Sequence, residues 1–486
     1  AKWRTPVTRM AEFITVVALI CGAMFVLVDL GRPDRAFNVV LYGRWQSPII
    51  WDLVSITTYL TASIVYLGLP MVPDMALFRD RLAGQTSRWR SWLYRVLAIG
   101  WNGNAAQRRS LASAIGVRTQ PGESWFNGKS SAENFAEARD YLIHWTGVTT
   151  TIGQGEYDCT HYLGEYAIPM LFLATWAQDP AMRQRGRMML DYVLADFAVE
   201  TLNGAYIGAH ARTDDNTVLE KWNSLSSFFA WLFFHNCPAP ASFGGWGIYF
   251  ATVAQHYELP EVIYRIATDR SGAYTHYERK RTRHRWRHSD VRNAPVYKTT
   301  YVTADYAVGS DQGGLLQPIQ QHSLDVTWAV PDPRGVHNTM FSVQAHYSVE
   351  ELMMYFTEMP DSMPNAVTFQ SKPTYISEGK LLGGSPFEQI FQQDDTVIAL
   401  TNVPPGENFE QVNGFFSKDL VQREEDASGW IFAQGGRAYL AYRPLAAYEW
   451  RPLEKGGQRL RSPHGKNGTI LHAASAGEFT SWDDFK

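Results

Sequence analysis

Two long apolar segments lie within the first 72 residues of this 486-residue chain, and no comparable segment follows them. Residues 11–30, AEFITVVALICGAMFVLVDL, carry charge only near their ends. Residues 49–72, IIWDLVSITTYLTASIVYLGLPMV, contain one acid, Asp52. Each segment is long enough to cross the roughly 30 Å hydrocarbon core of a bilayer as a helix, whereas residues 92–101, WLYRVLAIGW, are too few. The sequence therefore predicts a membrane fragment, residues 1–116, with transmembrane helices at 11–30 and 49–72.

Basic residues orient these two segments. Three precede the first segment and five arginines follow the second between residues 79 and 95, whereas the intervening loop has three. The positive-inside rule then places the N-terminus and the residues after 72 in the cytoplasm. The apolar run has no small-x-small cleavage site, which favours a spanning helix in the inner membrane over a signal peptide. Asp52 is either an interfacial acid or a residue that faces a bundle interior or a proton path.

Four motifs in series suggest a family for this fragment. RTPVTRMAE, DLGRPDR, SPIIWDLVSITTYLT and VPDMALFRDR…LAIGWNG resemble, over about residues 3–117, the NrfD-like polysulfide-reductase membrane subunits, including the quinone-interacting subunits of alternative complex III. The resemblance implies a helical-bundle subunit that exchanges electrons and protons with quinone beside iron–sulfur respiratory subunits. It also implies that Asp52 lies near the quinone or a proton path, with Arg32 and Asp34 in the adjoining loop. The pattern stops at ASAIGV, however, and two helices cannot enclose a quinone pocket.

The remaining chain has the distribution of apolar and polar residues that is typical of a water-soluble protein. Residues 118–290 contain successive amphipathic segments, such as AENFAEARDYLIHW and PAMRQRGRMMLDYVLADFAVE, which predict a helical domain like part of an α/α toroid. Residues 291–486 alternate apolar and polar residues between turns, which predicts an antiparallel β-sandwich. The expected fold is therefore multidomain: transmembrane helices, a partial α/α-toroid-like domain and a β-sandwich.

Three polar clusters are the candidate sites of chemistry. The first, in GQGEYDCTHY, comprises Glu156, Tyr157, Asp158, His161 and Tyr162. The second, in LNGAYIGAHAR, comprises Asn203, Tyr206, His210 and Arg212. The third, at the start of the expected sandwich, comprises Tyr306, Asp311, Gln312, His337 and Asn338. Helix caps and loop anchors are the structural alternatives for these residues.

The second cluster has the residue types that β-elimination on a uronate needs. Asn, Arg or His commonly neutralises the substrate carboxylate, and Tyr and His suit the roles of base and acid, so Asn203, Tyr206, His210 and Arg212 supply the required types within ten residues. A hydrolase would instead need two carboxylates, for which Glu156 and Asp158 are nearest. The residues expected to bind substrate are Tyr157, His161, Tyr162, Trp222, Tyr306, Gln312, His337 and Asn338.

GQGEYD…YLGEYAIPMLFL and YAVGSDQGG resemble heparinase- and alginate-lyase-like toroid proteins over about residues 124–486. The resemblance implies a lyase acting on an acidic, uronate-containing polysaccharide, without a cofactor, in the periplasm or outside the cell. A glycoside hydrolase, a carbohydrate-binding protein without turnover, and a quinone-interacting membrane subunit with an adventitious remainder are the alternatives.

Charge and cysteine content argue against nucleic-acid-binding, metal-binding and disulfide-rich classes of protein. The net charge of −4 gives no general attraction to nucleic acid. The basic run of residues 278–292 is a site for an acidic polysaccharide, with nucleic acid as the less favoured ligand, or a solvated linker. The three cysteines lie far apart and form no metal-ligand spacing, so no metal site or disulfide framework is expected. Because both resemblances are incomplete at the same place, we interpret residues 112–125, ASAIGVRTQPGESW, as the breakpoint of a chimeric chain.

Overall fold

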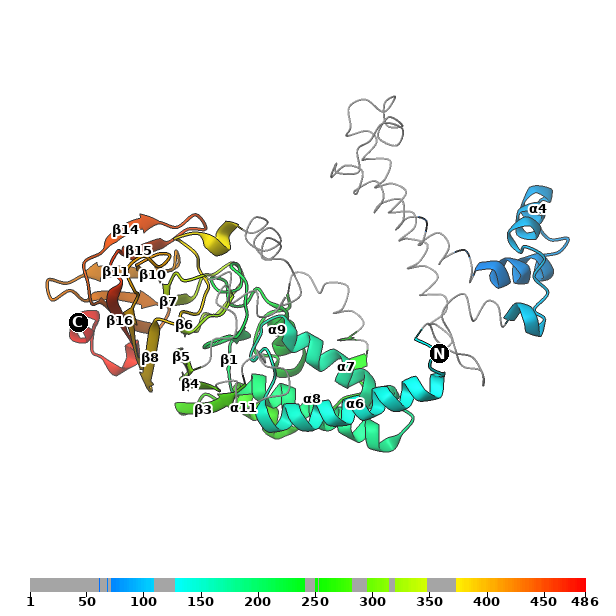
Figure 1. Ribbon diagram of the computed structural model, residues 1–486, viewed down its shortest axis with the longest axis horizontal. Coiled ribbons are helices and arrows are strands. Elements are labelled where there is room, and N and C mark those ends of the chain that lie inside the picture. The colour runs from blue at the N-terminus through cyan, green and yellow to red at the C-terminus, as the bar shows by residue number, and fades with distance from the viewer. Residues whose placement is uncertain are drawn as a thin grey trace, which may run out of the picture. The chain divides into compact units, whose positions relative to one another are not determined.

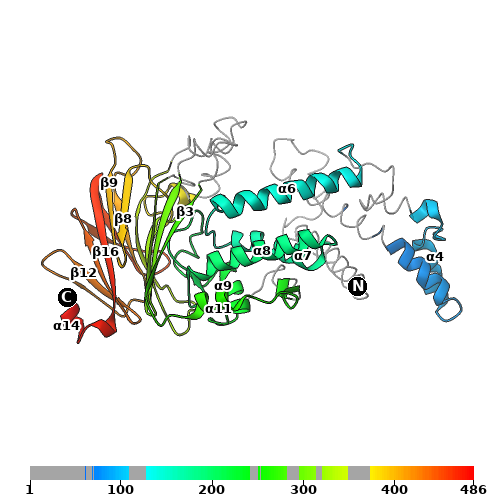
Figure 2. The same cartoon turned by 90° about the horizontal axis from the view of Figure 1, so that it is seen from below.

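The computed structural model describes residues 71–108, 127–240, 250–281 except 252, 295–313, 320–347 and 373–486, together with residues 61 and 68. The chain divides into two compact units, Ala1–Tyr141 and Leu142–Lys486. Their helices and strands are labelled in Figures 1 and 2.

The described part of the first unit is helical. One helix covers residues 71–81, and α4 covers Arg88–Leu97, within the stretch that the sequence marks as too short to span a membrane. None of the helices in the described ranges combines the length and the apolar character that a membrane crossing requires. The predicted helix at 11–30 lies outside the described residues, and so does the predicted helix at 49–72 apart from residues 61, 68, 71 and 72. The interpretation of residues 112–125 as a breakpoint also concerns residues outside the described ranges.

Helices make up the first part of the second unit, as the periodicity predicts. Their bounds are α6 Ser131–Ile152, which begins before the unit boundary, α7 Tyr162–Trp176, α8 Pro180–Ala198, α9 Leu225–Phe229, the π-helix η2 Ala230–Phe234 and α11 Glu261–Thr268. Pro180 opens α8, and the Asp179 side chain accepts a hydrogen bond from the backbone N–H of Ala181 at 2.9 Å, which is a favourable N-terminal cap.

A buried apolar cluster holds these helices together. It includes Leu171 of α7, Leu190 and Phe197 of α8 and Phe229 of α9, all essentially inaccessible to solvent. α7 and α8 are joined by residues 177–179 only and therefore pack as a helical hairpin. The described helices show no closed ring of hairpins, so the expected toroid is not seen in this part of the chain.

Two antiparallel sheets follow, and a small hairpin precedes them. The hairpin pairs β1 Thr201–Leu202 with β2 Ala205–Tyr206. The eight-stranded sheet has the order β14-β15-β10-β7-β6-β5-β4-β3, with strands β3 Tyr274–Lys280, β4 Val296–Val302, β5 Tyr306–Gly313, β6 Leu324–Trp328, β7 Thr339–Gln344, β10 Val412–Phe416, β14 Glu449–Pro452 and β15 Gln458–Ser462. The six-stranded sheet has the order β11-β12-β13-β16-β9-β8, with strands β8 Glu388–Gln393, β9 Thr396–Asn402, β11 Gln422–Glu425, β12 Ile431–Gly435, β13 Ala438–Pro444 and β16 Lys466–Ser475. Short helices η5 Pro373–Ile376, η6 Ala476–Glu478 and α14 Trp482–Phe485 complete this part.

The two sheets form a sandwich. One buried cluster contains Val308 and Trp328 from the eight-stranded sheet and Ile431, Leu440 and Leu471 from the six-stranded sheet. Figure 2 shows the sheets as adjacent layers. The antiparallel sheet structure predicted for residues 291–486 is thus present, but the sheet starts earlier than expected. β3 lies within the range that the sequence predicts to be helical, and it pairs with β4 along its whole length.

Candidate functional site

A loop before α7 brings the first predicted cluster against the β-sandwich. Asp158 in this loop has φ +49°, a left-handed conformation that Asp and Asn adopt more readily than most residues. Only 1% of the residue is exposed, so its carboxylate lies inside the second unit. The position of Asp158 therefore depends on the packing of helices against strands.

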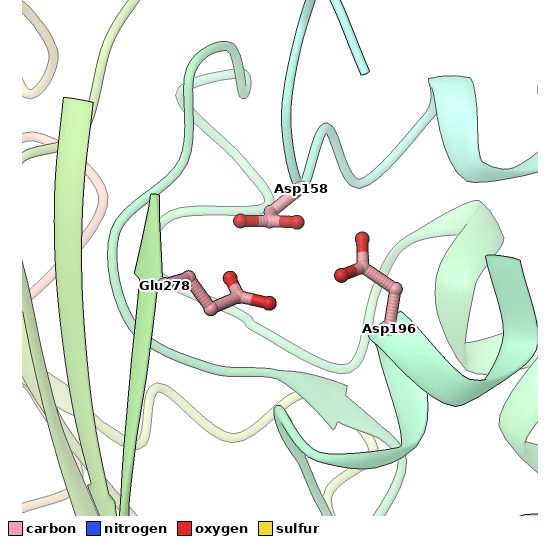
Figure 3. Close-up of side chains that lie close together, drawn as sticks. All are labelled: Asp158, Asp196 and Glu278. Carbon is pink, nitrogen blue, oxygen red and sulfur yellow. The ribbon is translucent and has the colours of Figure 1, made fainter. Parts of the chain in front are cut away.

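Six charged side chains surround this position, and we call them the carboxylate–lysine cluster. They are Asp158, Asp196 at the end of α8, Glu200 after it, Glu278 and Lys280 of β3, and Lys298 of β4. The carboxylates of Asp158, Asp196 and Glu278 point toward one another from a loop, a helix and a strand (Figure 3).

Each of the two lysines pairs with several of the carboxylates, and Asp158 pairs with both lysines. Lys280 Nζ lies 3.2 Å from Asp158 Oδ1, 2.7 Å from Asp196 Oδ1 and 3.0 Å from Glu278 Oε2. Lys298 Nζ forms an ion pair with Asp158 Oδ2 and lies 2.6 Å from Glu200 Oε2. Thr300 completes the arrangement because its hydroxyl donates to Glu200 Oε1 at 2.6 Å. Four carboxylates thus share two ammonium groups in a buried space.

Burial and charge shift the pKa values of these groups in opposite directions. Burial raises the pKa of Asp196 and of Glu200 above the ordinary carboxyl value, and their lysine partners oppose this shift only in part. Burial also acts against the charged form of Glu278, but Lys280 and a hydrogen bond from His276 lower the pKa of Glu278 below its usual range. Burial alone would lower the pKa of Lys280, yet the carboxylates around it, Asp158 foremost, raise that pKa well above its ordinary value. Both lysines are therefore charged at neutral pH.

The same three carboxylates of Figure 3 are the one set of potential metal ligands found among the described residues. Their oxygen atoms lie within 4.8 Å of one another, and hard cations prefer such ligands. However, the Lys280 ammonium lies within 3.2 Å of all three residues. A metal ion would have to displace that ammonium, so we assign the set to ion pairing.

Tyr206 and His210, predicted as base and acid, both contact Asp158. The Tyr206 hydroxyl donates to Asp158 Oδ1 at 2.8 Å, and His210 Nδ1 donates to the Asp158 carbonyl oxygen at 2.7 Å. Lys221 Nζ donates to His210 Nε2 at 3.4 Å. Burial and the charge of Lys221 lower the pKa of His210 well below its ordinary value, so its imidazole is neutral. Tyr206 and His210 are only 2% and 1% exposed, so a polymer could reach them only after rearrangement.

A second buried ion pair lies behind His210. Lys221 pairs with Asp325 of β6, and His322 Nε2 lies 3.0 Å from the same carboxylate. The backbones of His210 and His322 exchange two hydrogen bonds, at 2.8 and 2.9 Å, which tie the loop to the sandwich. Burial raises the pKa of Asp325 in isolation, but Lys221 reverses this and lowers it below its usual range.

Glu156, Tyr162 and Arg212 form a separate group nearer to solvent, which we call the rim group. Arg212 Nη1 donates to the Tyr162 hydroxyl at 2.5 Å and lies 3.4 Å from Glu156 Oε2, and its guanidinium stacks over the Tyr162 ring at 5.1 Å. The Arg212 side chain is 31% exposed. His161, next in the chain to Tyr162, is 66% exposed and lies 3.9 Å from Glu165. Of these residues, Arg212 and His161 have side chains partly or largely exposed to solvent, whereas Glu156 is buried.

The other predicted residues have different surroundings. Asn203 donates to the Val330 carbonyl oxygen, Asn338 donates to the Trp328 carbonyl oxygen, and the His337 backbone N–H donates to Asp419. Buried members are Tyr157, which donates to Asp311 Oδ2 at 2.6 Å, Trp222, and Tyr306 in the sandwich core, whereas Gln312 is exposed. The structure therefore does not bring these residues into one cleft with the rim group.

Sequence reasoning missed the lysines of the site. One signal was available for Lys298, because Val296, Lys298, Thr300 and Val302 share the buried face of β4 in the alternation of that strand. Pairing of Lys221 with Asp325 had no signal, since 104 residues separate them and both lie among ordinary polar positions. Asp52, Arg32 and Asp34 lie outside the described residues. Cys159 and Cys237 are free in the described part of the chain.

Comparison with known proteins gives one family match and two curated relatives. The family model described as polysulphide reductase, NrfD, matches residues 2–103. The chain is 29% identical over 75 residues to a putative dimethyl sulfoxide reductase membrane subunit of Halobacterium salinarum, which covers 15% of this chain and 17% of that protein. It is 24% identical over 101 residues to a selenate reductase subunit of Mesobacillus selenatarsenatis, covering 21% of this chain and 23% of that protein.

The chain thus spans about a fifth of the length of these curated relatives. No solved structure matches. The NrfD-like character expected for the N-terminal part is confirmed over residues 2–103. The resemblance of residues 124–486 to heparinase- and alginate-lyase-like proteins is not shown by any of these matches.

Proposed function

We propose that the N-terminal part of this chain is a quinone-interacting membrane segment of a respiratory oxidoreductase. The observation that carries the proposal is the NrfD family match over residues 2–103. Subunits of that family interact with quinone and work beside reductase partners, and the two relatives are named as subunits of reductases. This support favours the membrane subunit over the polysaccharide lyase as the main function.

Asp52, Arg32 and Asp34 are the residues that we assign to this chemistry by resemblance. Exchange of electrons with a quinone or quinol also takes up or releases protons, and an acid within an apolar segment is costly unless it is paired or lies on a proton path. Asp52 would carry protons along this path, and Arg32 and Asp34 would lie at the entrance of the path. Iron–sulfur partners would exchange these electrons with the quinone.

The test uses the full chain in membranes that contain its reductase partners. A photoreactive quinone should label residues 2–103, and Asp52→Asn should reduce quinone-linked reductase activity by about tenfold or more, because it removes the proton carrier. Asp80→Asn is the matched control, because Asp80 is exposed and paired with Arg79 at the surface. Recovery of the chain without detergent, or labelling confined to other subunits, would contradict the proposal.

A second candidate function concerns the second unit alone, namely binding or cleavage of a carboxylate-bearing polysaccharide. The observation that favours it is the rim group, where a partly exposed guanidinium at Arg212 is held by Tyr162 beside the exposed His161. Arginine suits a uronate carboxylate because it can donate two parallel hydrogen bonds. A lyase would still need a base at the substrate, and Tyr206 and His210 would have to become accessible to serve.

This candidate is tested with the full chain and a panel of acidic polysaccharides. Cleavage by β-elimination creates an unsaturated uronate with a characteristic ultraviolet absorbance, and Arg212→Ala should abolish its appearance. Arg437→Ala is a suitable control, since Arg437 is exposed on the sandwich and pairs with Asp305. If binding is seen without any absorbance change, the carbohydrate-binding alternative replaces the lyase. If neither is seen, this candidate function fails.

A further inference from the structure

α4 presents an apolar face that is exposed in the part of the chain that the structure describes. Trp89 is 61% exposed, Trp92 is 62% exposed and Val96 is 50% exposed. No residue of the helix is buried. Two tryptophans in contact with water on one short helix are unusual for a soluble protein surface, so this face requires a partner.

The spacing of these residues defines a single stripe. Trp89, Trp92 and Val96 follow the i, i+3, i+7 pattern, which places side chains on one face of a helix. At 3.6 residues per turn, Arg88 and Arg95 fall beside the stripe on one side, whereas Arg90 lies a further 100° around the helix from Trp89. The Arg90 guanidinium nevertheless lies 5.6 Å from the centre of the Trp89 ring. The helix contains no acid, so every charged residue of α4 is positive.

The opposite side of α4 already has a neighbour. The ring of Tyr94 lies 5.7 Å from the ring of Phe78 in the helix of residues 71–81. Leu77 and Phe78 are themselves 46% and 43% exposed, and Ile99 after α4 is 75% exposed. The neighbouring helix and the residue after α4 thus also expose apolar side chains, while the contact of Tyr94 with Phe78 fixes which side of α4 faces away from that helix.

The chemistry of the stripe selects a lipid surface. Tryptophan concentrates at membrane interfaces, where its ring is in contact with acyl chains and its N–H with water. Arginines beside an apolar face can extend to lipid phosphates while their stems cover apolar surface. A helix of ten residues is about 15 Å long and cannot cross the hydrocarbon core, so it would lie in the plane of the membrane.

We propose that α4 is an in-plane helix that binds an anionic lipid surface through Trp89, Trp92 and Val96, with Arg88, Arg90 and Arg95 on the headgroups. The proposal rests on the membrane location proposed above for the N-terminal part, but it requires no quinone. The lipid proposal concerns residues that the structure describes, whereas Asp52, Arg32 and Asp34 of the quinone proposal lie outside the described ranges.

Photocrosslinking of the full chain tests this assignment. Trp92 is replaced by the photoreactive residue p-benzoylphenylalanine, and the protein is reconstituted into vesicles of phosphatidylcholine with or without phosphatidylglycerol. Trp176 is the matched control position, because its exposure of 61% is close to the 62% of Trp92 and it lies at the end of α7 in the second unit. We expect lipid adducts at position 92, enriched in phosphatidylglycerol, and few at position 176.

Neutralising the arginines tests the charge component separately. Each arginine near an anionic surface contributes about fivefold, which corresponds to about 1 kcal/mol. The variant Arg88→Gln, Arg90→Gln, Arg95→Gln should therefore lose the preference for phosphatidylglycerol adducts while circular dichroism stays unchanged.

Three outcomes overturn the proposal. Adducts at position 92 with a polypeptide would show that α4 binds a protein. If the chain stays in the vesicles but gives no lipid adducts at position 92, α4 does not bind lipid, and the quinone proposal is unaffected. A chain that does not associate with vesicles would overturn both.

Discussion

Lys298 lies on β4 with its side chain fully buried between two carboxylates from the helical part of the second unit. Taking a charge out of water is expensive, and attraction to a partner returns that free energy only when the geometry is good. Lys298 meets this condition through an ion pair with Asp158 and a 2.6 Å contact with Glu200. Its contribution to stability depends on keeping both partners.

Lys298→Met should therefore destabilise the folded chain strongly. Removing one member of a buried ion pair leaves a buried charge without compensation, which typically costs about 3–5 kcal/mol. Lys418→Met is the control, because Lys418 pairs with Asp419 at the surface, where an ion pair contributes about 1 kcal/mol or less. Urea denaturation followed by circular dichroism measures both free energies, and equal losses would contradict the assigned role of the cluster.

Asp311 provides a pH-dependent prediction. Burial raises the pKa of its carboxyl group from 3.8 to about 6, although Tyr157 and Ser323 donate hydrogen bonds to it. Between these values the folded protein holds a proton that the unfolded chain releases, so stability is greatest below the unfolded pKa and falls as pH rises through the folded pKa. The loss amounts to as much as about 3 kcal/mol.

Asp311→Asn should remove this component. We expect the free energy of unfolding of the variant to fall less than that of the wild type between about pH 4 and pH 7, whereas other buried acids such as Glu200 affect both proteins alike. Denaturation series at several pH values measure the difference. Parallel profiles of the two proteins would mean that Asp311 is already ionised in the folded state at low pH.

Packing between elements depends on a close backbone contact between Gly208, in the loop after β2, and Gly309 of β5. A Cβ atom at position 309 would lie 2.3 Å from the Cα of Gly208, which no side-chain rotation can relieve. The loop carries His210 and Arg212, so the contact also sets the position of both candidate residues. Glycine at both positions permits this approach.

Gly309→Ala should separate the loop from β5. The expected cost is about 1–3 kcal/mol, as for other overpacked positions. Gly272→Ala is the matched control because a Cβ there would meet nothing within 4 Å. Denaturation gives the free energies. Equal stability of the two variants would show that the loop and the strand are farther apart in solution.

Prediction from the sequence succeeded for elements that bury a regular face. α8 was recognisable from its apolar spacing and Pro180, and β9 and β13 from their alternation. Five strands were missed: β3, β8, β11 and β14 are the edges of the two sheets, and β15 lies inside the eight-stranded sheet. Edge strands have one neighbour and carry polar and charged residues, as in QREE of β11, so the apolar signal is weak. The candidate site was only partly predictable for a similar reason, because Lys298 and Asp158 are joined by tertiary pairing across 140 residues.

At the scale of the whole molecule, the two compact units are expected to be energetically independent. The boundary between them lies at residues 141 and 142. The carboxylate–lysine cluster, the Lys221–Asp325 pair and both apolar clusters named above draw all their members from the second unit. The described part of α4 and its neighbouring helix belongs to the first unit and shares none of these interactions.

Hydrogen exchange of the full chain in detergent tests this independence. Lys298→Met should accelerate exchange in peptides from α8, β3 and β4, because opening of these elements tracks the stability that the ion pairs supply. Peptides from residues 71–108 should exchange at the wild-type rate, and Lys418→Met should change neither region. Since domains fold around their own cores, a mutation within one core should leave the other unaffected. Faster exchange in residues 71–108 of the Lys298→Met protein would instead mean that the two units stabilise each other, and the chain would then have to be treated as one folding unit.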